Sequence, residues 1–87
     1  MKLDKKVALV TGGSTGIGRA TAIALAKEGA SVAITARRAE RCDDAVSEIE
    51  DFGGSAMALP GDISDPEHVE SLVKETISRW GRLDIVV

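Results

Sequence analysis

The feature that most constrains the fold is a cluster of four glycines in the seven residues from Gly12 to Gly18. It follows an apolar run, Lys6–Thr11, whose length and β-branched residues predict a buried strand. It opens an Ala-rich segment, closed by Gly29, that predicts a helix. Glycines let the backbone turn sharply and let a phosphate approach without a Cβ in the way, and a helix N-terminus favours an anion. We therefore predict that this loop binds an anion such as a pyrophosphate.

The rest of the chain repeats the same alternation of strand and helix. Three further apolar runs predict strands, and the segments between them predict two more helices. Strands that are apolar at nearly every position need helices on both faces, which predicts a parallel sheet. Right-handed crossovers then give an α/β fold that is part of a Rossmann-like, doubly wound parallel sheet. The predicted strand order is 3-2-1-4. The predicted strands are 31–36, 55–60 and 83–87, and the predicted helices are 39–52 and 65–80. We expect residues 1–87 to be the N-terminal, dinucleotide-binding part of a single domain, truncated after the fourth strand.

Both later helices show an apolar stripe at helical spacing. In the first, the stripe contains Cys42, Ala45, Val46, Ile49 and Phe52. In the second, it contains Val69, Leu72, Val73, Ile77 and Trp80. Ser64 or Asp65 is predicted to cap the helix over residues 65–80. Glu67 would complete a capping box with Ser64.

The composition of the 87 residues excludes several classes of function. The net charge is −3, and no block of Lys and Arg supports binding to nucleic acid or to an anionic membrane. The single cysteine forms no internal disulfide, which fits a reducing compartment. No apolar run is long enough for a signal sequence or a membrane span, so we expect a cytoplasmic protein.

The spacing of the glycines, G-G-x-x-G-x-G, differs from the G-x-G-x-x-G fingerprint and lacks the G-K-[ST] ending of a P-loop. The segment TGGSTGIG resembles the T-G-x-x-x-G-x-G cofactor motif of the short-chain dehydrogenases/reductases, and the resemblance covers the whole chain as the N-terminal cofactor-binding part of such an enzyme. It implies that three glycines line a nicotinamide dinucleotide and that three other residues contact its phosphate and ribose. The glycines are Gly12, Gly16 and Gly18, and the other residues are Ser14, Thr15 and Ile17.

The end of the second predicted strand bears on which cofactor binds. Dinucleotide folds place an acidic residue there to bind the ribose 2′-OH, or an arginine that accommodates a 2′-phosphate. By resemblance the acidic position is Ala36, and Arg37 and Arg38 follow it. A guanidinium binds phosphate with two parallel hydrogen bonds. We therefore predict NADP as the cofactor, with Arg37 as the main contact.

Two further observations bear on this prediction. Arg38 and Arg41 lie near the start of a helix, where the dipole disfavours cations, and such a departure can mark a functional site. A solvated helix edge is the alternative explanation. Thr15 occupies the position where the family frequently has a basic residue, so NAD remains possible.

The loop after the third strand supplies the last predicted contacts. By resemblance, Asp62 hydrogen-bonds the adenine amino group and the backbone of Ile63 adds a contact. The alternative for Asp62 is a turn-forming role before the next helix, which Asp favours. His68 and Cys42 are interpreted as structural residues, and no metal site is predicted.

The catalytic step of the family needs residues that this sequence does not contain. Hydride transfer between a nicotinamide and a carbonyl or alcohol carbon uses, in the family, a Ser and a Y-x-x-x-K pair that lie beyond the fourth strand. This chain has no tyrosine, so no catalytic residue is predicted in it.

Two interpretations stay open. The chain is the cofactor-binding half of a longer NADP-dependent oxidoreductase, which would act on a small carbonyl or alcohol substrate and would be a homo-oligomer. Alternatively, it is a stand-alone, non-catalytic nucleotide-binding module or a vestigial fragment. A methyltransferase-like site is disfavoured, since it too needs an acid at position 36.

Overall fold

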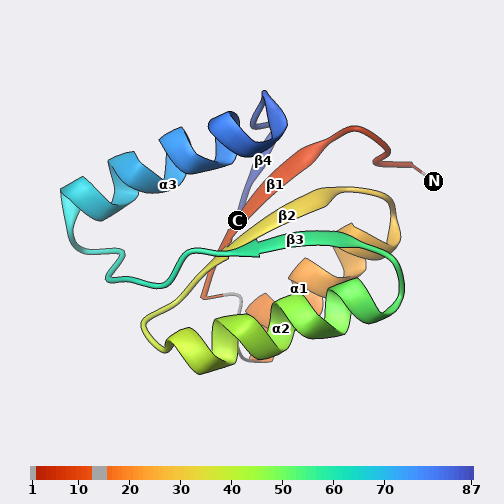
Figure 1. The fold of residues 1–87 in the computed structure, drawn as a ribbon, viewed down its shortest axis with the longest axis horizontal. Coiled ribbons are helices and arrows are strands. Elements are labelled where there is room, and N and C mark those ends of the chain that lie inside the picture. Colours follow the sequence, from red (N-terminus) through yellow and green to blue (C-terminus); the bar gives the residue numbers. More distant parts are fainter. Residues whose placement is uncertain (1, 13–15) are drawn as a thin grey trace.

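The computed structural model describes residues 2–12 and 16–87, in which strands and helices alternate (Figure 1). The strands form one parallel sheet in the order β3-β2-β1-β4, which confirms the predicted α/β fold and strand order. The strands are β1 (Val7–Thr11), β2 (Ser31–Thr35), β3 (Ser55–Ala58) and β4 (Ile85–Val86), and the helices are α1 (Gly16–Lys27), α2 (Ala39–Asp51) and α3 (Pro66–Trp80).

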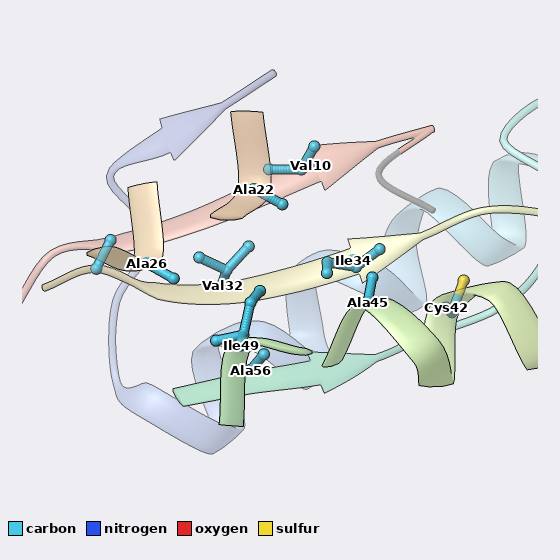
Figure 2. Close-up of a cluster of buried hydrophobic side chains, with 10 residues drawn as sticks. Val10, Ala22, Ala26, Val32, Ile34, Cys42, Ala45, Ile49 and Ala56 are labelled. Atoms are coloured by element: carbon cyan, nitrogen blue, oxygen red, sulfur yellow. The ribbon is translucent and has the colours of Figure 1, made fainter. Parts of the chain in front are cut away.

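Two helices, α1 and α2, cover one face of the sheet, and α3 lies on the other (Figure 1). The larger core lies between the sheet and the α1–α2 layer (Figure 2). Many of its side chains are alanines, which let the helices approach the strands closely. Its buried residues are Val10, Ala22, Ala26, Ala30, Val32, Ile34, Cys42, Ala45, Ile49 and Ala56. The predicted stripe of α2 is confirmed except at its end, where Phe52 follows the helix and is exposed beneath the Lys27 ammonium.

The predicted core stripe of α3 is wrong at three positions. Leu72 is buried, but Val69, Val73 and Ile77 are 37–45% exposed. The face turned to the sheet instead carries residues 68, 72 and 76, which are spaced by four. Thr76 can be buried there because its hydroxyl donates to the Leu72 carbonyl at 2.6 Å, so no hydrogen bond is lost.

The start of α3 also differs in detail from the sequence prediction. Asp65 is the N-cap, and its carboxylate accepts the Glu67 N–H at 3.0 Å. The predicted capping box with Ser64 is wrong, because the Ser64 hydroxyl donates to the Asp62 carboxylate at 2.8 Å. The helix ends at Gly81, whose φ of 81° is the left-handed conformation that glycine adopts readily.

The short strand β4 is secured by hydrogen bonds beyond its own two residues. The Asp84 carboxylate accepts the Val7 N–H at 2.9 Å and pairs with the Arg82 guanidinium at 2.7 Å. At the other end, Thr11 donates both its N–H and its hydroxyl to the Val87 carbonyl. No helix within residues 2–12 and 16–87 has the length and apolar character that crossing a membrane requires.

Adjacent residues of α3 should differ in their contribution to stability. We expect Leu72→Ala to lower the free energy of unfolding by about 2–5 kcal/mol, because it removes a fully buried side chain. Val73→Ala, on the exposed face, should change it by about 0.5 kcal/mol. Urea unfolding of the two variants measures the difference, and equal losses would mean that the Val73 face is covered in solution.

Candidate functional site

The carboxyl ends of the parallel strands meet at one edge of the sheet, on the left in Figure 1. Hydrogen bonds continue the ladder past the strand ends into the loops. The Gly12 N–H donates to the Thr35 carbonyl at 2.9 Å, and the Gly61 N–H donates to the Ala36 carbonyl at 2.9 Å. The first residues of the loops after β1, β2 and β3 are therefore held side by side.

The described residues at the two ends of the loop after β1 are glycines with positive φ. Gly12 and Gly16 have φ angles of 65° and 56°, which glycine adopts without strain. Within residues 2–12 and 16–87, no atom from outside the immediate chain neighbourhood lies within 4 Å of the position a Cβ would take at either residue. The first turn of α1 carries no acidic residue, although its dipole would favour one. No carboxylate in the first turn of α1 would therefore compete with an anion at this helix start. The predicted contacts of Ser14 and Thr15 lie outside the described residues.

Two of the predicted cofactor residues are large apolar side chains exposed to solvent. Ile17, in the first turn of α1, is 87% exposed, and Ile63, in the loop after β3, is 50% exposed. Gly18 follows Ile17 in α1 and is half-buried. Ile17 at the start of α1 and Ile63 in the loop after β3 therefore expose apolar surface that a ligand could cover.

Arg37 and Asp62 are brought together from different loops. The Arg37 guanidinium lies 3.5 Å from the Asp62 carboxylate, and both side chains are well exposed. Asp62 also accepts the Ser64 N–H at 2.9 Å and the Ser64 hydroxyl. These two bonds, with a smaller contribution from Arg37, hold the pKa of Asp62 below its ordinary value. Asp62 thus forms a turn, as its alternative interpretation predicts, while standing beside Arg37.

The two residues that flank Arg37 have different environments. Ala36 is half-buried and packs against the larger core. Arg38 is exposed and occupies the N-cap position of α2, where no side chain caps the helix. An uncapped helix start with a cation at the N-cap leaves backbone donors and a positive charge free for an anionic group.

His68, which the sequence analysis interprets as a structural residue, makes a contact with the sheet that the sequence did not predict. Its Nε2 lies 3.0 Å from the hydroxyl of the buried Thr35, at the carboxyl end of β2. The signal that could have found it is spacing, since His68 stands four residues before Leu72 on the face of α3 that meets the sheet. Cys42, by contrast, is buried in the core, where desolvation raises the pKa of its thiol.

The geometry agrees with comparisons to known proteins. The sequence model of the short chain dehydrogenase family matches residues 6–87. The chain belongs to this family. A hydroxynaphthalene reductase of Aspergillus fumigatus is 44% identical to this chain over 88 residues, which cover all of this chain and 32% of the relative.

Solved structures of the family superimpose closely on this fold. A dehydrogenase/reductase from Sinorhizobium meliloti is 50% identical, with a TM-score of 0.94 over 98% of this chain and 34% of that one. A metagenomic short-chain oxidoreductase in complex with NADP is 35% identical, with a TM-score of 0.93 over 99% of this chain and 39% of that one. The chain therefore spans about a third of the length of the proteins it matches, and it corresponds to their N-terminal cofactor-binding part.

The lowered pKa of Asp62 predicts how the stability of the fold depends on pH. Because the folded pKa lies below the ordinary value, the Asp62 turn should stabilise the fold above the usual carboxyl range. This contribution should be lost as the pH falls through the folded pKa. Carbon NMR of the Asp62 carboxyl should show a low titration midpoint that Ser64→Ala raises. Because Ser64→Ala keeps the Ser64 N–H, the outcome that would contradict the assigned cause is a midpoint at the ordinary carboxyl value in the unmodified protein.

Proposed function

We propose that this chain binds the cofactor of an NADP(H)-preferring oxidoreductase, which transfers a hydride between the nicotinamide and a carbonyl or alcohol carbon of a small substrate. The observation that carries the proposal is the end of β2. An alanine stands where NAD-binding sites hold a carboxylate, and the next residue, Arg37, reaches the loop after β3. A 2′-phosphate would meet a guanidinium there without a carboxylate at position 36.

The remaining predicted residues fit one extended dinucleotide along the same edge. The pyrophosphate would lie on the glycine turn, at Gly12, Gly16 and Gly18, with Ser14, Thr15 and Ile17 at the phosphate and ribose. Asp62 and the Ile63 backbone would hold the adenine, and Arg38 would add positive charge. When bound, the cofactor supplies the hydride, and this chain's residues bind and orient it.

The groups that move the proton belong to another part of the protein in this proposal. In the family this role falls to a tyrosine, and these 87 residues contain none. The complex of a similar oxidoreductase with NADP supports the choice of cofactor. The hydroxynaphthalene reductase supports a small carbonyl or alcohol substrate.

The second candidate is a non-catalytic nucleotide-binding module, which the same cofactor-binding residues would also suit. The intact mass of the protein as its source produces it separates the two. A mass far above 9.1 kDa, together with NADPH-dependent reduction of a carbonyl substrate panel, supports the oxidoreductase. A mass of 9.1 kDa, with NADPH binding but no turnover, supports the module. Absence of NADPH binding contradicts both.

Arg37 should set the affinity for the 2′-phosphate. We expect Arg37→Ala to weaken NADPH binding by about 10- to 100-fold, as loss of charged hydrogen bonds does, and to change NADH binding little. Calorimetric titration with each nucleotide measures the two dissociation constants.

Arg41→Ala is the matched control, since it removes the same charge from the exposed face of α2, one helical turn beyond Arg38. If Arg41→Ala weakens NADPH as much as Arg37→Ala does, the effect is one of net charge and the assigned contact is wrong.

Ala36→Asp should shift the preference toward NAD(H). The new carboxylate would accept the ribose 2′-OH and repel a 2′-phosphate. We expect the ratio of NADPH to NADH affinity to fall by at least about 10-fold, which corresponds to about 1.4 kcal/mol. Ala36→Asn, similar in size but uncharged, should change the ratio less, and an equal change would show that size rather than charge is responsible.

A further inference from the structure

One side chain of α3 reaches the carboxyl edge of the sheet. His68 stands in the first turns of the helix, and its Nε2 lies 3.0 Å from the Thr35 hydroxyl. Thr35 is only 1% exposed, and a buried hydroxyl of this kind needs a hydrogen-bond partner, which His68 supplies. The bond therefore ties the start of α3 to the last residue of β2.

The ring of His68 also lies against the loop after β3. A Cβ placed on Gly61 would come within 2.3–2.6 Å of three ring atoms of His68, closer than atoms can approach. The absence of a side chain at Gly61 is what lets the ring lie over the loop backbone. Gly61 precedes Asp62, which pairs with Arg37.

The two residues that His68 contacts anchor all three loops of the candidate site. The Thr35 carbonyl accepts the Gly12 N–H, which starts the glycine turn after β1. The Gly61 N–H donates to the Ala36 carbonyl, which joins the loop after β3 to the one after β2. A shift of the His68 ring would thus be transmitted to the glycine turn and to the Arg37–Asp62 pair.

The other residues on this face of α3 do not bond in this way. Leu72 is apolar, and the Thr76 hydroxyl donates within the helix to the Leu72 carbonyl. His68 is the one of the three that forms a hydrogen bond across to the sheet, and it does so at the end where the ligand would bind.

We propose that His68 is a positioning residue that sets the spacing of the three cofactor loops, and thereby the affinity for the dinucleotide. The inference rests on the proposed function, because it assigns a dinucleotide to these loops. His68 itself lies behind them and acts through Thr35 and Gly61.

A pair of amide variants separates hydrogen bonding from simple packing. In His68→Gln the side-chain amide can reach the place of Nε2, whereas in His68→Asn it ends near the place of Nδ1 and falls short of Thr35. We expect His68→Asn and Thr35→Val to weaken NADPH binding by about 5- to 10-fold, and His68→Gln by less than about 2-fold. The double variant His68→Asn/Thr35→Val should bind no more weakly than either single variant, because both remove the same bond.

Thr76→Val is the matched control, on the same face of α3 two helical turns from His68. It should lower the free energy of unfolding but leave the NADPH dissociation constant within about 2-fold. All measurements use the complete protein that carries this chain. Equal affinities for His68→Gln and His68→Asn, or an equal loss in Thr76→Val, would overturn the positioning role.

Amide hydrogen exchange without nucleotide tests the same role independently of ligand identity. We expect the Gly12 and Gly61 amides to exchange faster in His68→Asn than in His68→Gln or Thr76→Val. If the unmodified protein binds no NADPH, the proposed function fails while this exchange pattern still decides whether His68 positions the loops. Unchanged exchange at both glycines in His68→Asn overturns the inference.

Discussion

The candidate site depends on two backbone carbonyl groups at the carboxyl end of β2. They belong to Thr35, the last residue of the strand, and to Ala36, which follows it. β2 lies between β1 and β3, so the segment that leaves it borders both neighbouring loops. The Thr35 carbonyl accepts the Gly12 N–H on one side, and the Ala36 carbonyl accepts the Gly61 N–H on the other. Loops that would otherwise move independently therefore begin from fixed, adjacent positions, which is what a ligand spanning several loops requires.

The two faces of the sheet support this edge in different ways. On one face, α1 and α2 pack through small, fully buried residues such as Ala22, Ala26 and Ala45 (Figure 2). On the other, α3 contacts the sheet through a smaller cluster around Leu9, Ala33 and Leu72. With less apolar area buried there, the orientation of α3 depends more on directional bonds, including the one from His68 to Thr35.

Much of the fold follows from the sequence. The alternation of apolar strands with helical segments predicts the seven elements and the strand order, because parallel strands with right-handed crossovers allow few arrangements. The rotation of α3 was not predictable in this way. Its apolar residues mark one stripe, yet Thr76 and His68 occupy the stripe that meets the sheet, since each finds its own hydrogen bond. A count of apolar residues cannot reveal such satisfied polar groups.

The site was predictable to a different degree at each position. The glycine turn follows from local conformational demands, and the structure places Gly12 and Gly16 at positive φ accordingly. Contacts between loops, such as Arg37 with Asp62, depend on the tertiary arrangement and carry no local signal. The same holds for Ser64, whose hydroxyl donates to the Asp62 carboxylate, while Asp65 accepts the Glu67 N–H as the cap of α3.

The exposed pairing of Arg37 with Asp62 has a consequence for binding. Water and salt screen a pair at the surface, so it holds the guanidinium near the end of β2 without binding it tightly. A phosphate carries more negative charge than a carboxylate and can accept two parallel N–H bonds from arginine, so it would displace Asp62 from Arg37. Asp62 would keep its two bonds from Ser64 and its place in the turn. One displacement would then supply a cation to the ribose phosphate and leave a carboxylate oxygen available to an adenine amino group.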